Sequence, residues 1–153
     1  MIFSSRTFAE LNVYTLYDIL CLRQRVFVVE QHSAYLDGDG LDPQALHLLA
    51  EDENVLVGYA RIVPPAQADD AVRIGRLVIA PEQRGKGLGT RLMRQAMELA
   101  CKHYGGVIAI SAQTYLEPFY EALGFARAGE PQDEAGVSHV AMQRPCSAHA
   151  VSL

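Results

Sequence analysis

The residues with the clearest chemical potential form a glycine-rich loop that follows an apolar run. The run Leu77–Ala80 ends at Pro81, and three alternating glycines, Gly85, Gly87 and Gly89, then precede an amphipathic segment. This order predicts a strand, a loop and the start of a helix. A helix N-terminus exposes unpaired N–H groups at the positive end of the peptide dipole, and glycines let a ligand approach the backbone closely. We therefore expect the loop to bind an oxyanion, and a pyrophosphate fits best.

Spacing separates this loop from two other nucleotide-binding loops. A P-loop requires Gly-Lys-Ser/Thr after a fixed spacing, whereas Lys86 is followed by Gly87. A Rossmann loop requires a third glycine where Thr90 stands, and an acidic residue after the next strand, where the sequence has Gln113. The pattern that remains is R-G-K-G-L-G, residues 84–89, whose two basic side chains add positive charge.

This loop resembles motif A of the GCN5-related N-acetyltransferases (GNAT), which binds the pyrophosphate of acetyl-coenzyme A (acetyl-CoA). A second resemblance lies in AQTYLEPFYEALGF, where Gln113, Tyr120, Gly124 and Phe125 occupy positions of that family's pattern. The segment FVVEQ, residues 27–31, resembles the sequences of one branch of the family in particular, the ElaA-like proteins. The resemblance covers roughly residues 16–142.

The resemblance implies a mixed α/β acyl-CoA N-acyltransferase fold, with a mostly antiparallel twisted sheet that splays open at the acetyl-CoA site between flanking helices. We expect one domain over residues 1–145 and a flexible tail over 146–153. Apolar periodicity predicts, in chain order, a helix over 16–27 capped by Asn12 or Thr15, strands at 47–50, 55–63 and 72–79, a helix from 88 to about 105, a strand at 107–111, a helix at 116–123, and strands at 125–128 and 138–142.

The resemblance also implies roles for individual residues. The thioester oxygen is expected to meet backbone N–H groups of Leu77, Val78 and Ile79. Tyr120 is expected to protonate the departing thiolate; the alternative is that it is only a core aromatic. The complete set expected to contact acetyl-CoA is Leu77, Val78, Ile79, Arg84, Gly85, Lys86, Gly87, Gly89, Thr90, Gln113, Phe119 and Tyr120.

A base for the acceptor amine is harder to locate. Some members of the family carry Glu or His on the strand before the loop, but this strand presents Arg73 and Arg76 instead. Glu30 is our first candidate, and water relayed to solvent is a competitor. The remaining candidates are His47, Glu82 and His139.

An acidic loop and two arginines define the expected acceptor side. The loop over residues 37–42 holds three aspartates, but Leu41 and Leu48 stand where an EF-hand needs ligands, so we expect a turn at the acceptor entrance and no metal site. Arg61 and Arg76 are expected to recognise an anionic group of the acceptor; ordinary ion pairs are the alternative.

Composition limits the class of partner. The chain has 153 residues and a net charge of −5 at pH 7, which argues against nucleic acid or an anionic membrane as the main partner. No apolar stretch reaches membrane length and no secretory signal is evident, so we expect a cytoplasmic monomer or homodimer. Three cysteines without CxxC spacing indicate free thiols, with neither a disulfide framework nor a zinc site.

Together these observations predict an acetyl-CoA-dependent N-acetyltransferase that transfers the acetyl group directly to a primary amine of a small molecule or peptide. Neither a metal nor a cysteine nucleophile is needed. The alternative is an acyl-CoA-binding module that has lost catalysis and acts as a sensor. A nicotinamide-binding protein is disfavoured because the Rossmann features are missing.

Overall fold

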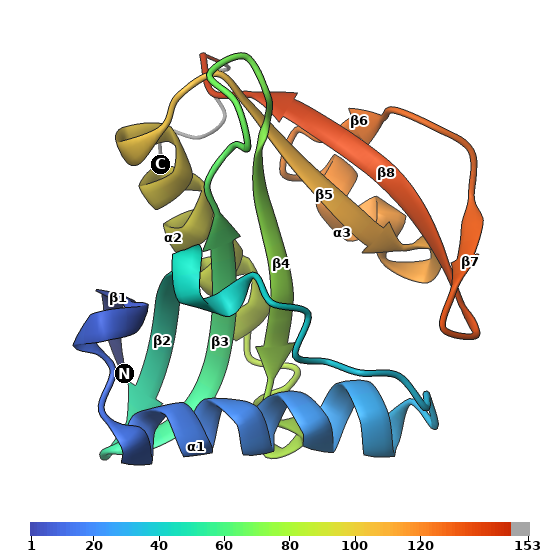
Figure 1. Cartoon of the computed structure of the whole chain (residues 1–153). Coiled ribbons are helices and arrows are strands. Elements are labelled where there is room, and N and C mark those ends of the chain that lie inside the picture. Colours follow the sequence, from blue (N-terminus) through green and yellow to red (C-terminus); the bar gives the residue numbers. More distant parts are fainter. Residues whose placement is uncertain (148–153) are drawn as a thin grey trace.

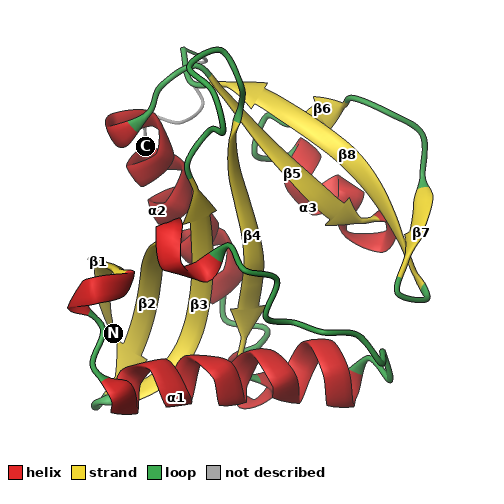
Figure 2. Ribbon diagram, viewed as in Figure 1, coloured by secondary structure: helices red, strands yellow, loops and turns green. Residues whose placement is uncertain are grey.

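The computed structural model describes residues 1–147 and forms a single twisted sheet with helices on both faces (Figure 1, Figure 2). The strands are β1 (Ile2–Thr7), β2 (Leu46–Asp52), β3 (Val55–Val63), β4 (Val72–Ile79), β5 (Val107–Gln113), β6 (Ala126–Arg127), β7 (Gln132–Glu134) and β8 (Val137–Pro145). The helices are α1 (Val13–Arg23), which continues in π-helical form over Gln24–Glu30, α2 (Leu88–His103) and α3 (Glu117–Glu121).

The strand order is β1-β2-β3-β4-β5-β8-β6, with β7 on the other edge of β8. Among the strands of residues 1–147, β4 and β5 alone pair in parallel, while the other pairs are antiparallel. The expected mixed, mostly antiparallel fold is therefore confirmed. Asn12 caps α1, since its side chain accepts a hydrogen bond from the Thr15 backbone N–H at 2.8 Å.

Strands β1 and β7 were not predicted from the sequence, and the reasons differ. In β1, polar residues follow Phe3 and the strand forms one edge of the sheet, so it shows little apolar alternation. In β7 all three residues are exposed. The helix expected over 116–123 is shorter, because a 3₁₀ turn precedes it and Gly124 ends the segment at a φ of +93°.

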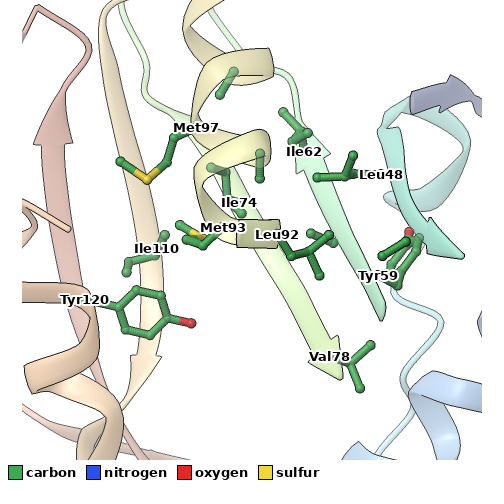
Figure 3. Packing of buried hydrophobic residues seen from close by; sticks show 14 of the residues in the cluster. Leu48, Tyr59, Ile62, Ile74, Val78, Leu92, Met93, Met97, Ile110 and Tyr120 are labelled. Atoms are coloured by element: carbon green, nitrogen blue, oxygen red, sulfur yellow. The ribbon is translucent and has the colours of Figure 1, made fainter. Parts of the chain in front are cut away.

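The core contains buried residues of α1 and its extension, such as Ile19, and a larger set between the sheet and α2. Leu92, Met93 and Met97 on one face of that helix are at most 1% exposed. Figure 3 shows these side chains packed toward Ile62 and Ile74 on β3 and β4. Burial of this apolar face holds α2, and the glycine loop before it, in a fixed position on the sheet.

The feature that creates the site is a split between β4 and β5. The two strands are in register only at Val72 with Ile108 and at Arg73 with Ala109, and they then diverge (Figure 1). A bulge in β4 accompanies the split: its pairing with β3 shifts register and Arg76 adopts a φ of +53°. Bulges of this kind bend a strand and are common beside active sites.

Two of the three cysteines are bonded, which corrects the expectation of free thiols. Cys101 on α2 and Cys146 after β8 form a disulfide, while Cys21 is free and exposed. The pairing was missed because 45 residues separate the two cysteines and only the fold brings them together. Of the expected tail, residues 148–153 lie outside the described part of the chain. Within residues 1–147, no helix combines the length and apolar character needed to cross a bilayer.

Candidate functional site

A cavity of about 1010 Å³ occupies the split between β4 and β5. The π-helical segment after α1, the glycine loop, α3 and the β7–β8 turn complete its walls. Most of the residues expected to contact the cofactor line it, namely Leu77, Val78, Ile79, Arg84, Gly85, Gly87, Gly89, Gln113, Phe119 and Tyr120. Lys86 and Thr90 do not line it. Four chain segments that are distant in sequence therefore meet around one space.

The glycine loop presents backbone to this cavity. Gly85 and Gly87 adopt φ values of +79° and +78°, which side chains rarely tolerate, and no atom lies within 4 Å of where a Cβ would stand on either. Gly87 is the N-cap of α2, and no side chain caps the helix. The first N–H groups of α2 are therefore left for a ligand, as an anion site requires.

The free edge of β4 forms the opposite part of the same space. Beyond Arg73 this strand has no partner on the β5 side within residues 1–147, although it stays paired with β3 as far as Ile79. Leu77, Val78 and Ile79 lie in this stretch. Their edge-facing backbone groups can hydrogen-bond an extended ligand as a strand would.

Tyr120 reaches the cavity from α3. Its side chain is 8% exposed and packs edge-on against Phe119 and Phe125, with ring centroids 4.9 and 6.1 Å away. Figure 3 shows its hydroxyl directed away from α3, toward the side of β4. Within residues 1–147 no protein group hydrogen-bonds this hydroxyl. Burial raises the pKa of Tyr120 to about 12, so the phenol stays protonated at neutral pH.

The four base candidates have different surroundings. Glu30 lines the cavity and receives two hydrogen bonds from Arg84, at 2.7 and 3.0 Å, which lower its pKa. Neither His47 nor Glu82 lines the cavity: the former is buried against the Tyr59 hydroxyl, and the latter forms an exposed ion pair. His139 lines the cavity.

Arg23 anchors the acidic loop to α1. Its Nε donates to Asp37 at 2.7 Å and its Nη1 donates to Asp42 at 2.7 Å, and the side chain is only 1% exposed. Tyr35 adds a 2.5 Å hydrogen bond from its hydroxyl to Asp37. Burial would raise the pKa of Asp42, but the guanidinium groups of Arg23 and Arg61 outweigh it and lower that pKa. The buried ion pairs of Arg23 therefore hold the acidic loop against α1.

Arg61 and Arg76 hold the same loop from the strands. Arg61 makes a two-pronged contact with Asp39, with both distances 2.8 Å, and is 4% exposed. Arg76 lies 2.8 Å from Asp37 through Nε and 3.3 Å from Asp39 through Nη2. Both line the cavity, yet both guanidinium groups already have carboxylate partners. An anionic group of the acceptor would therefore compete with Asp37 and Asp39 for these two arginines.

Two hydrogen-bonded links between residues that line the cavity were not expected from the sequence. The Ser33 hydroxyl donates to the Ala135 carbonyl at 2.6 Å, which joins the loop after α1 to the β7–β8 turn across the cavity. Ser111 and Glu134, which are hydrogen-bonded to each other, lie near His139 and line the cavity with it. Neither link follows a local motif, and no signal in the sequence pointed to them.

Comparison with known proteins identifies the family. Residues 10–146 match the family described as "Acetyltransferase (GNAT) domain". Protein ElaA of Escherichia coli is 37% identical over 139 residues, covering 89% of this chain and 91% of ElaA.

Solved structures agree with the sequence match. The crystal structure of Escherichia coli ElaA superimposes with a TM-score of 0.89 at 35% identity, covering 94% of this chain and 98% of that one. An acyl-CoA N-acyltransferase from Pseudomonas aeruginosa gives a TM-score of 0.88 at 34% identity, with 94% and 99% covered. The chain therefore belongs to the GNAT family, in its ElaA-like branch, and is an acyltransferase.

Proposed function

We propose that this acyltransferase uses acetyl-CoA and transfers its acetyl group directly to a primary amine of a small molecule or peptide. The observation that carries the proposal is the continuity of the cavity. It runs from the open N-terminus of α2, past the free edge of β4, to Tyr120. The N-terminus of α2 can bind the pyrophosphate, the edge of β4 can hydrogen-bond the pantetheine amides, and Tyr120 can protonate the thiolate.

Each part has a distinct task in this scheme. Backbone N–H groups around Gly87 bind the pyrophosphate, and Arg84, held by Glu30, adds charge beside it. Backbone N–H groups of Leu77, Val78 and Ile79 stabilise the thioester oxygen as negative charge develops on it.

Tyr120 then donates its proton to the departing thiolate. The phenol is protonated at neutral pH, and within residues 1–147 no protein acceptor competes for its proton. The tyrosine thus suits a general acid better than a residue that only fills the core.

The acceptor is proposed to be an amine that also carries a carboxylate. Arg73 lines the cavity and has no ion-pair partner within residues 1–147, so an anion meets it without displacing a carboxylate. Arg61 and Arg76 are the other residues proposed to bind the acceptor, whose carboxylate would share their guanidinium groups with Asp39.

The test uses the full chain with acetyl-CoA and a panel of glycine, glutamate, spermidine and poly-lysine, with free thiol as the readout. We expect acetyl-CoA to raise the melting temperature, NAD to leave it unchanged, and glutamate or glycine to give the fastest thiol release. Stabilisation by acetyl-CoA without thiol release from any amine would favour the sensor module instead. Preference for spermidine would contradict the anionic acceptor but not the transfer itself.

A further inference from the structure

The acceptor wall of the cavity carries a polar cluster that the proposed cofactor site does not use. Ser111 on β5, Glu134 on β7 and His139 on β8 all line the cavity. The Ser111 hydroxyl lies 3.2 Å from each carboxylate oxygen of Glu134, and His139 Nδ1 lies 3.5 Å from Glu134 Oε2. Three strands thus bring a hydroxyl, a carboxylate and an imidazole together.

Strand geometry places this cluster opposite Tyr120. Side chains alternate along β5, so Ser111 and Gln113 share one face while the buried Ile110 lies on the other. Figure 3 shows Ile110 beside Tyr120, on the α3 side. His139 pairs in register with Gln113 and therefore lies on the Ser111 face. The imidazole and the phenol approach the cavity from opposite faces of the sheet.

The hydrogen bond of the imidazole fixes which nitrogen is available as a base. His139 Nδ1 lies 2.8 Å from the Val137 carbonyl oxygen, which can only accept, so Nδ1 carries the proton. In the neutral ring the lone pair is then on Nε2, and no protein group within residues 1–147 hydrogen-bonds that nitrogen. The side chain is 17% exposed, in keeping with an imidazole at the cavity wall.

We propose that His139 is the general base that deprotonates the acceptor amine, with Glu134 as the residue that orients its ring. The inference rests on the proposed function. The amine nitrogen bonds to the acetyl carbon and gives one proton to His139 Nε2, the carbon–sulfur bond breaks, and the thiolate takes the Tyr120 proton. The imidazolium then releases a proton to solvent and the phenolate regains one, so the products are an amide and a thiol.

Glu30 is the weaker base by comparison, because Arg84 stabilises its carboxylate and lowers its pKa. Within the described chain, β5 contributes no charged side chain near His139, and β7 contributes Glu134 with Asp133 beside it. The other titratable groups on the cavity wall are Glu30, Tyr35, Asp39, Arg61, Arg73, Arg76, Arg84, Tyr115 and Tyr120. Glu134 is therefore the carboxylate positioned to stabilise the imidazolium.

The kinetic test compares wild type with His139→Asn, whose amide can still donate to the Val137 carbonyl but is not basic. With the fastest amine of the panel, single-turnover acetyl transfer at neutral pH should fall by roughly a hundredfold or more, and added imidazole should restore part of it in His139→Ala. Acetyl-CoA affinity should change by less than about twofold. The exposed His103→Asn, which lies outside the cavity, is the matched control and should match wild type.

Glu134→Gln provides the readout for positioning. It should lower kcat for the fastest amine while leaving the KM of that amine and the acetyl-CoA affinity nearly constant, because the ring loses a neighbouring carboxylate that does not contact substrate in this scheme. Nitrogen NMR of the imidazole should find the proton of the neutral ring on Nδ1, independently of activity.

A wild-type rate in His139→Asn, or a neutral ring protonated on Nε2, would overturn the assignment of His139. Absence of transfer to every amine by wild type would overturn the proposed function and this assignment with it.

Discussion

The two sides of the cavity are built in different ways. On the proposed cofactor side, the cavity offers mainly backbone groups: the turn at Gly87 and the unpaired edge of β4. On the proposed acceptor side, the cavity is lined by side chains that are distant in sequence, such as Asp39, Arg61 and His139.

This difference indicates how the fold divides its tasks. A backbone site tolerates substitution of its side chains, provided that glycines and strand geometry are kept. A site built from side chains can change its specificity through few substitutions, but its geometry depends on the acidic loop over residues 37–42, which ion pairs hold in place. The predictions below test this division, from the largest expected effect to the smallest.

Arg23→Met should be the most damaging change, because it leaves Asp37 and Asp42 without their buried cation. Removing one partner of a buried ion pair typically costs about 3–5 kcal/mol of unfolding free energy. Urea denaturation measures the loss. Arg25→Met, which breaks an exposed pair with Glu82, is the matched control and should leave stability nearly unchanged. Equal losses in the two variants would show that the loop does not depend on buried charge.

Gly87→Asp should remove acetyl-CoA binding, with affinity reduced by about a hundredfold or more, through a strained φ and a carboxylate beside the pyrophosphate. Titration calorimetry measures the affinity. Gly106→Asp carries the same backbone penalty, at a φ of +73°, but lies outside the cavity. If both variants bind acetyl-CoA equally well, the backbone turn is not the anion site.

Tyr120→Phe should lower kcat by roughly ten- to a thousandfold while acetyl-CoA affinity stays nearly constant, because the ring remains and only the proton is lost. Rapid-quench measurement of the chemical step separates this effect from product release. Phe125→Leu, which alters the packing around the same ring, serves as the comparison for indirect effects. An unchanged chemical step would return Tyr120 to a packing role.

Glu30→Gln should have the smallest effect, a change in kcat below about threefold, since an exposed ion pair contributes little energy. Steady-state kinetics with the fastest amine measures it. A hundredfold fall would instead make Glu30 the base and would remove the reason for assigning that role to His139.

Local patterns made one half of the site predictable. The glycine spacing and the apolar periodicity predict a turn and a helix start from neighbouring residues, and Gly85 and Gly87 of this turn line the cavity. Their contact with the cofactor stays a prediction. The Ser33–Ala135 link spans 102 residues and has no local signature. The same holds for the partners of Arg61: its charge was visible in the sequence, whereas its pairing with Asp39 depends on how the loop folds back.

The short parallel contact between β4 and β5 has a consequence for hydrogen exchange. Only two register pairs, at Val72 and Arg73, join the strands on either side of the split. Amides on the facing edges below these pairs have no neighbouring strand to protect them, so they exchange with solvent deuterium while the rest of each antiparallel ladder is retained. An extended ligand in the gap hydrogen-bonds the free edge of β4 in place of the missing strand. Ligand binding should therefore slow the hydrogen exchange of backbone amides over residues 77–79.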